Sequence, residues 1–122
     1  MFKVGQIVTT KKLGIYGITD YMKPLEVINS NHNLTEVKPL WENRVTYTLE
    51  NSSLRVMLER EILHEGDIIK IHQGRRNLIA KFISYTDYGI YARVENLGTG
   101  NFSMHTIQFD KIGKKGLYVS YV

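Results

Sequence analysis

Short runs rich in Val, Ile, Thr and Tyr alternate with polar segments that contain Gly, Pro, Asn or Ser along the whole chain. Runs of this kind are typical of β-strands, and the polar segments between them are typical of turns. The pattern predicts strands over residues 6–11, 15–21, 25–28, 35–40, 45–49, 54–58, 67–72, 78–85, 89–95, 102–109 and 117–121. We therefore expect an all-β fold.

One segment, 52–64, fits two structures. Leu54, Met57, Leu58, Glu61 and Ile62 recur at the three- and four-residue spacing of a helix. The same region also contains a polar tetrapeptide between two apolar runs, which is typical of a β-hairpin turn. The sequence leaves both structures open, and it predicts at most one short helix there.

Two similar strand starts divide the chain. Val4-Gly5-Gln6-Ile7-Val8 begins the first half and Glu65-Gly66-Asp67-Ile68-Ile69 begins the second. Glycine followed by a polar and two apolar residues is typical of a turn that leads into a strand of a small β-barrel. A second pair, Gly14-Ile15-Tyr16 and Gly89-Ile90-Tyr91, requires a different offset. A tandem repeat and a chance similarity therefore both remain open.

The length of 122 residues suits one ordinary domain or two very small ones. We expect two β units, 1–58 and 59–122, or one continuous domain. The net charge of +4 is concentrated in the second half, where residues 62–122 contain eight Lys or Arg and five Asp or Glu. A basic excess favours a polyanionic partner such as nucleic acid.

Several classes of chemistry have no support in the sequence. The absence of cysteine excludes disulfides, thiolate zinc sites and cysteine nucleophiles, and it fits a reducing compartment. The four histidines have no metal-ligand spacing, and there is no phosphate-binding loop or nucleophile-elbow motif. No apolar run is long enough for a signal peptide or a membrane span. We expect a cytoplasmic protein that is not an enzyme and has no metal, cofactor or membrane partner.

Basic and aromatic residues gather around one turn of the second half. The candidate nucleic-acid-binding residues are Lys70, His72, Arg75, Arg76, Lys81, Tyr85 and Tyr88. Lys and Arg contact phosphate oxygens, and exposed tyrosines stack on bases. The alternative is a solvated hairpin whose tyrosines are partly in the core.

Trp41, the only tryptophan, lies at a predicted strand end before a polar segment. Indole is enriched at the energetic centres of protein interfaces, and it is also a large apolar group that fills a barrel. The sequence predicts either a core position or an anchor for a protein partner.

The first half resembles a known type of domain. The segments Lys3-Val4-Gly5-Gln6-Ile7-Val8 and Tyr16-Gly17-Ile18-Thr19, followed by Val27, Glu36-Val37 and Tyr47, are similar to the small SH3-like barrels of bacteriophage and prophage proteins from Gram-positive bacteria. The resemblance covers residues 1–57, and Gly66-Asp67-Ile68-Ile69-Lys70 resembles the start of another such barrel. It implies one or two antiparallel SH3-like barrels and a binding module from a mobile element, with no catalytic residues.

Two functions are therefore expected from the sequence. The first is nucleic-acid binding through the basic and tyrosine-rich surface of the second half. The alternative is a protein-protein interaction module that inhibits a host protein, or that forms a homodimer through a sheet edge.

Overall fold

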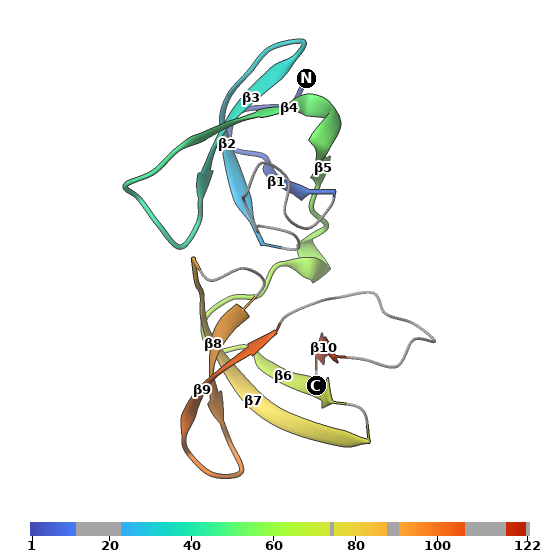
Figure 1. Ribbon diagram of the computed structural model, residues 1–122, viewed down its shortest axis with the longest axis vertical. Helices are drawn as coiled ribbons and strands as arrows, with labels where there is room; N and C mark the ends of the chain where they lie inside the picture. The colour runs from blue at the N-terminus through green and yellow to red at the C-terminus, as the bar shows by residue number, and fades with distance from the viewer. Residues whose placement is uncertain (12–22, 74, 88–90, 107–116, 122) are drawn as a thin grey trace. The chain divides into compact units, whose positions relative to one another are not determined.

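The computed structural model describes residues 1–11, 23–73, 75–87, 91–106 and 117–121. The chain divides into two compact units, Met1–Ile62 and Leu63–Val122. The sequence predicts a boundary between two units after residue 58. Each unit contains a five-stranded antiparallel sheet (Figure 1). The predicted all-β fold class is confirmed. The predicted strand 15–21 lies outside the described residues.

The first unit contains strands β1 to β5. Their bounds are β1 (Ile7–Thr10), β2 (Leu25–Ser30), β3 (Leu34–Pro39), β4 (Tyr47–Glu50) and β5 (Leu54–Val56). The order in the sheet is β4-β3-β2-β1-β5, so β1 lies between β2 and β5. Alternate residues face the core, which contains the fully or nearly fully buried side chains of Val8, Leu25, Val27, Val37, Leu49 and Leu54. Each such side chain contributes about 1.5–3 kcal/mol through burial.

The second unit contains strands β6 to β10. Their bounds are β6 (Ile68–Gln73), β7 (Arg76–Tyr85), β8 (Tyr91–Asn96), β9 (Phe102–Thr106) and β10 (Leu117–Tyr121). The order is β10-β6-β7-β8-β9, which is the order of the first unit with β10 in the place of β5. Its buried side chains again alternate along the strands and include Ile69, Ile71, Ala80, Phe82, Ala92 and Val94.

The segment 52–64 forms neither the α-helix nor the hairpin that the sequence leaves open. It contains β5 between two single-turn 3-10 helices, η2 (Asn51–Ser53) and η3 (Glu59–Glu61). Strand β5 pairs with β1, whereas β4 pairs with β3. The turn η2 carries the chain from one end of the sheet order to the other, and the Lys11 amide donates to the Ser53 carbonyl at 2.9 Å. The spacing of apolar residues within this segment does not predict the crossing, because the crossing depends on pairing between strands that are far apart in the sequence.

The two glycine-led strand starts have the same backbone geometry. Gly5 has φ of 87° and Gly66 has φ of 95°, a region that favours glycine. The Gly5 amide donates to the Val27 carbonyl at 2.8 Å, and the Gly66 amide donates to the Phe82 carbonyl at 2.9 Å. Each glycine therefore anchors its turn to the second strand of its own unit.

The residue after each glycine completes this match. A side-chain oxygen of Gln6 accepts from the Lys3 amide at 3.1 Å, and one of Asp67 accepts from the His64 amide at 2.8 Å. Polar side chains at these positions satisfy turn amides that no strand pairs. The polar residue in both starts therefore has a structural role.

A β-bulge occurs at the same place in both units. The β2–β3 register shifts between Val27 and Asn29, which makes Ile28 the extra residue. The β7–β8 register shifts between Phe82 and Ser84, which makes Ile83 the extra residue. An extra residue reverses which later side chains face the core. The two units thus share strand order, glycine turn and bulge.

Candidate functional site

The outer face of β6 to β9 contains three of the predicted site residues, Lys70, His72 and Lys81. Its residues alternate with the buried ones, and the pairing register aligns them across the four strands. We call this surface the basic face and define it by Ile68, Lys70, His72, Ile79, Lys81, Tyr91, Arg93, Glu95, Phe102 and Met104. It combines cations with exposed apolar side chains.

Two predicted lysines are neighbours on the basic face. Ile68 pairs with Lys81 and Lys70 pairs with Ile79, so the two lysines are diagonal across β6 and β7. Lys81 has the parity opposite to Phe82, which is only 2% exposed and faces the core. Among the described residues, neither lysine has a recorded ion pair. Both are half-buried.

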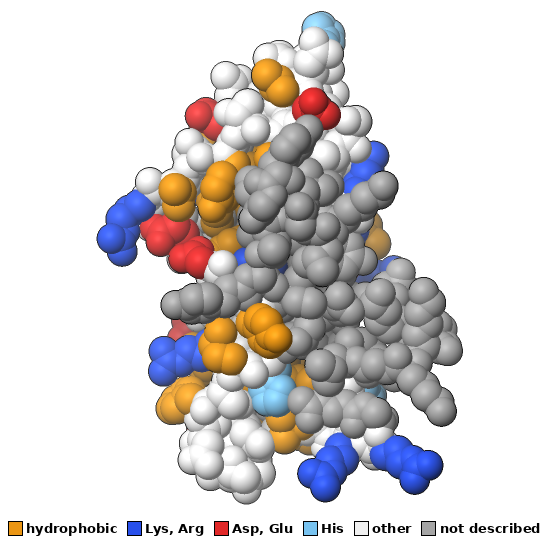
Figure 2. Space-filling model, in the orientation of Figure 1, with side chains coloured by type: hydrophobic (Ala, Val, Ile, Leu, Met, Phe, Trp, Pro, Cys, Tyr) orange, Lys and Arg blue, Asp and Glu red, His pale blue; other side chains and the backbone are white. Residues whose placement is uncertain are grey.

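An arginine and an aromatic ring extend the basic face across β8 and β9. The Arg93 guanidinium carbon lies 5.1 Å from the centroid of the Phe102 ring, and Phe102 is 57% exposed. A guanidinium over a ring is a cation-π contact. Figure 2 shows hydrophobic and basic side chains next to each other over these strands. An exposed ring beside a cation can contact a base and a phosphate together.

Arg75 and Arg76 lie where β6 turns into β7, and both are exposed. Figure 2 shows basic side chains around this end of the second unit. His72 and Asn77 pair across the two strands, with His72 Nδ1 and Asn77 Oδ1 2.9 Å apart. The structure therefore places Lys70, His72, Arg75, Arg76 and Lys81 along one hairpin.

Tyr85 lies in the core rather than on the basic face. It is 7% exposed, its hydroxyl accepts a hydrogen bond from the Leu63 amide at 2.9 Å, and its ring centroid lies 4.9 Å from that of Phe82. The bulge at Ile83 causes this position, because it reverses the alternation after Phe82. Tyr85 therefore presents no ring for stacking, and Tyr88 lies outside the described residues.

Strand alternation could have identified two residues of the basic face that the sequence-based site leaves out, Arg93 and Glu95. Ala92 and Val94 are apolar and small or β-branched, so their neighbours Tyr91, Arg93 and Glu95 share the other face. Assigning Phe102 to that face required the β8–β9 register, which the sequence does not specify.

Trp41 is half-buried and packs against the core cluster of the first unit. The Lys23 ammonium nitrogen lies 4.5 Å from the centroid of its ring, and Lys23 is fully buried. The packing favours the core position that the sequence left open. An additional role as an anchor for a partner stays a prediction.

On the matching face of the first unit, three positions carry the opposite charge. Glu26 pairs with Lys38 where the second unit pairs Lys81 with Glu95. Glu36 pairs with Thr48 where the second unit pairs Arg93 with Met104. Glu26, Lys38 and Glu36 therefore correspond to Lys81, Glu95 and Arg93, so an acid matches a base at each of these three positions.

The described residues give little support for a metal site or a membrane-spanning helix. No group of three or more His, Cys, Asp or Glu side chains in those ranges is arranged to hold a metal ion. The same ranges contain no helix with the length and apolar character that a membrane crossing requires.

Comparisons with known proteins do not assign the chain to a family. No family model matches it, and no curated protein matches its sequence. A solved structure entitled "Crystal structure of Arabidopsis thaliana AGDP1 AGD34" is similar over 87% of this chain and 78% of that chain, with 14% identity and a TM-score of 0.33. A similarity of this degree supports no inference about function.

Proposed function

We propose that the protein is a non-enzymatic binding module whose second unit binds nucleic acid through the basic face. The observation that carries this proposal is the alignment of Lys70, Lys81 and Arg93 with the exposed Phe102 ring on adjacent strands. Cations on a sheet contact phosphates, and a ring beside a cation provides a stacking surface for bases. The exposed Arg75 and Arg76 extend the positive charge along the hairpin.

The test is a titration of fluorescently labelled single-stranded DNA and RNA across about 50 to 200 mM salt, followed by anisotropy. We expect affinity to fall steeply as salt rises. The double variant Lys81→Ala with Arg93→Ala should lower the slope of log affinity against log salt by about 1.4, because each lost phosphate contact contributes about 0.7 for single strands.

Two further variants separate charge from stacking. Phe102→Ala should weaken binding by about 1–3 kcal/mol with a smaller change in salt slope, because base stacking is lost while the cations remain. Lys38→Ala removes a lysine from the matching face of the first unit, and it should leave affinity unchanged. Salt-independent binding, or full affinity after Arg75→Ala with Arg76→Ala, would refute the proposal.

The alternative is a protein partner on the same surface. Tyr91, Phe102 and Met104 are 46%, 57% and 44% exposed on neighbouring strands. Exposed aromatic residues and methionine are enriched at protein interfaces. A host protein as the partner, inhibition of it, a mobile-element origin and a homodimer through a sheet edge all stay predictions. Pull-down with the wild type and the Phe102→Ala and Trp41→Ala variants distinguishes the basic face from the Trp41 region.

A further inference from the structure

The basic face contains two exposed aromatic rings, one on β8 and one on β9. Tyr91 is 46% exposed and Phe102 is 57% exposed. Tyr91 pairs with Thr106 and Phe102 pairs with Glu95, and the register between these pairs is unbroken. Because Tyr91 and Glu95 are four residues apart on one strand, the two ring positions are offset by about 14 Å along the strands. Tyr91 is therefore a second stacking surface for a ligand that extends beyond Phe102.

A cation and an apolar side chain occupy the middle of this interval. Arg93 is two residues from Tyr91 on β8, Met104 is two residues from Phe102 on β9, and Arg93 pairs with Met104. Met104 is 44% exposed. The outer face of β8 and β9 thus presents a ring, a middle position with a cation and a thioether, and a second ring, at steps of about 7 Å.

The length of this step distinguishes a single strand from a duplex. Successive phosphates of one duplex strand are about 3.4 Å apart along the helix axis, and the bases between them stack on one another. A step of about 7 Å is twice as long, so a matching strand must be extended, with its bases unstacked and spread onto the protein. Three nucleotides then reach from Phe102 to Tyr91, and the phosphates between them lie near Arg93.

The charged residues next to this row are compatible with the same arrangement. Glu95 is the only acid among the residues that define the basic face, and it pairs with Lys81 on one side and with Phe102 on the other. Its carboxylate therefore lies next to the base position at Phe102, where it can accept hydrogen bonds from base amino groups. Arg93 and Lys81 are its neighbours on the outer face, and their charges remain for the phosphates.

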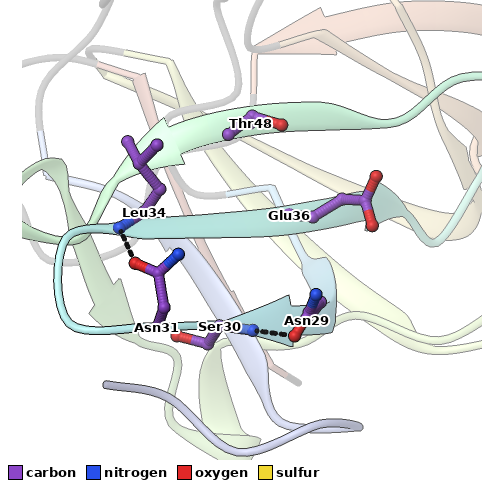
Figure 3. A pocket seen from close by; sticks show the side chains of 6 residues that line it. All are labelled: Asn29, Ser30, Asn31, Leu34, Glu36 and Thr48. Carbon is purple, nitrogen blue, oxygen red and sulfur yellow. Dashed lines mark hydrogen bonds between the residues drawn. The ribbon is translucent and has the colours of Figure 1, made fainter.

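The first unit provides an internal comparison on the same backbone plan. Its register places Leu34 where the second unit has Tyr91, and Glu36 where the second unit has Arg93. These two side chains border a polar hollow of about 240 Å³, which is also lined by Asn29, Ser30, Asn31 and Thr48 (Figure 3). A carboxylate at the middle position repels phosphate, and Leu34 provides no ring. The row of ring, cation and ring is therefore a property of the side chains of the second unit.

We propose that the basic face binds single-stranded nucleic acid in an extended form, with three nucleotides between the two rings. One base stacks on Phe102, another stacks on Tyr91, and Arg93 contacts the phosphates between them. The inference rests on the proposed function, because it requires that the basic face binds nucleic acid. It adds the exclusion of duplexes, the length of the bound segment and the role of Tyr91. Single-stranded DNA and RNA offer the same phosphates and base faces, so both serve as probes.

The first test compares single strands with fully paired duplexes of the same sequence and length, as DNA and as RNA. Fluorescence anisotropy is measured at about 200 mM salt, where attraction to phosphates alone is weakened. We expect single strands to bind about 25-fold or more tightly, because each of two stacked bases contributes about fivefold or more. Equal affinity for duplexes would overturn this inference and leave the proposed function in place. Binding to neither probe would overturn both.

The second test combines the length of the oligonucleotide with removal of each ring. Unlabelled oligonucleotides from one nucleotide upward compete with a labelled single strand. For the wild type, affinity should rise by about 5- to 150-fold between two and three nucleotides, because the third base reaches the second ring. This step should disappear in Tyr91→Ala and in Phe102→Ala, since each variant keeps only one ring. An affinity that rises evenly with length, or an unchanged step in Tyr91→Ala, would contradict the proposal.

Two control variants accompany this test. Tyr91→Phe keeps the ring and should bind as the wild type does. Leu34→Ala changes the equivalent position of the first unit, where Leu34 is 43% exposed, and it should leave the length step unchanged. Loss of the step in Leu34→Ala would count against the basic face as the site. Because Tyr91 and Phe102 are exposed, their replacement should not unfold the second unit, and an unchanged far-ultraviolet circular dichroism spectrum verifies this.

Discussion

The two units have the same backbone plan and opposite charges at three matched outer positions. Each has five strands in matching order, a glycine turn bonded to its second strand, and a bulge one residue beyond that bond. On the outer face, Glu26, Lys38 and Glu36 of the first unit stand where the second has Lys81, Glu95 and Arg93. Because outward side chains make few contacts with the core, their charge can change without altering the sheet.

The comparison separates what determines the fold from what determines the partner. The fold depends on turns, pairing and buried residues that both units share. On the outer face the two units carry different residues. We therefore expect the polyanion that we propose as the ligand of the second unit not to bind the first unit.

The prediction with the largest expected effect concerns whether the two units fold independently. Phe82→Ala should destabilise the second unit by about 3–5 kcal/mol, since it empties a core position that is 2% exposed. This is as large as the total stability expected of a core this small, so the second unit should unfold. Trp41, the only tryptophan, lies in the first unit, and its fluorescence reports urea unfolding of that unit.

The matched change is Val27→Ala, at the equivalent position in the first unit. It should lower the Trp41 midpoint through a loss of about 2 kcal/mol, because fewer buried methyl groups are removed. Phe82→Ala should leave that midpoint in place while far-ultraviolet circular dichroism loses the signal of the second unit. A Trp41 midpoint that falls equally in both variants would show that the two units unfold as one.

A smaller effect tests whether the two glycine turns are equivalent. Gly5→Ala and Gly66→Ala should each cost about 1–2 kcal/mol, because their φ values of 87° and 95° disfavour a side chain. A Cβ at either position meets nothing within 4 Å, so the cost comes from the backbone alone.

Gly98→Ala is the control for the turns, since Gly98 does not have a φ in that region and an added Cβ would make only an ordinary contact 3.4 Å from Asn96 Oδ1. We expect a change within about 0.5 kcal/mol. The measurement is chemical denaturation, with Trp41 fluorescence for Gly5 and NMR signals of β7 for Gly66. Clearly unequal losses at Gly5 and Gly66 would show that the turns contribute differently.

The smallest expected effect is a difference in acid sensitivity. Burial lowers the pKa of His105 from its ordinary value of 6.5. The unfolded second unit then binds a proton more readily than the folded one, so its stability should begin to fall as pH drops below about 6.5 and should continue to fall until the folded-state pKa is passed.

The first unit should respond only at lower pH. Burial of the Glu61 carboxyl raises its pKa, but hydrogen bonds from Arg55 and the Leu58 amide, with the charges of Arg55 and Arg60, outweigh burial and hold it below 4.5. The Arg55–Glu61 pair has two contacts, at 2.9 and 3.0 Å. Its stabilisation is present above pH 4.5 and is lost as pH falls through the folded-state pKa.

Unfolding midpoints measured from pH 7 to 4 test the predicted direction of the pH dependence of each unit. Between pH 7 and 5.5 the second unit should lose stability while the Trp41 midpoint stays constant. Replacement of His105 by Asn should remove that dependence, and Glu61→Gln should flatten the response of the first unit below pH 4.5. A Trp41 midpoint that falls already at pH 6 would contradict the assignment.

The sequence predicts the fold better than the site. Alternation and turn residues predict the described strands, because these signals act between near neighbours. The crossing at η2 depends on β5 pairing with β1, which no local pattern encodes. The lysines of the basic face follow from alternation along β6 and β7, whereas Phe102 requires the β8–β9 register. Strand alternation alone predicts Tyr85 on the outer face, because it does not predict the bulge at Ile83.

The bulges at Ile28 and Ile83 also determine which mutations each strand tolerates. A substitution at either isoleucine alters one side chain, and deletion of that residue removes the bulge while the residues on both sides keep their partners and their facing. Without Ile83, Phe82 and Ser84 would be consecutive and would still pair with Val94 and Arg93, so Tyr85 would remain in the core with its hydroxyl near the Leu63 amide. A one-residue deletion should therefore be tolerated better at these two positions than elsewhere in β2 or β7, where it would reverse the facing of the residues on one side of it. Related chains are thus expected to differ in length at the bulge while they keep an apolar residue at the glycine-bonded position, Val27 or Phe82, in the core.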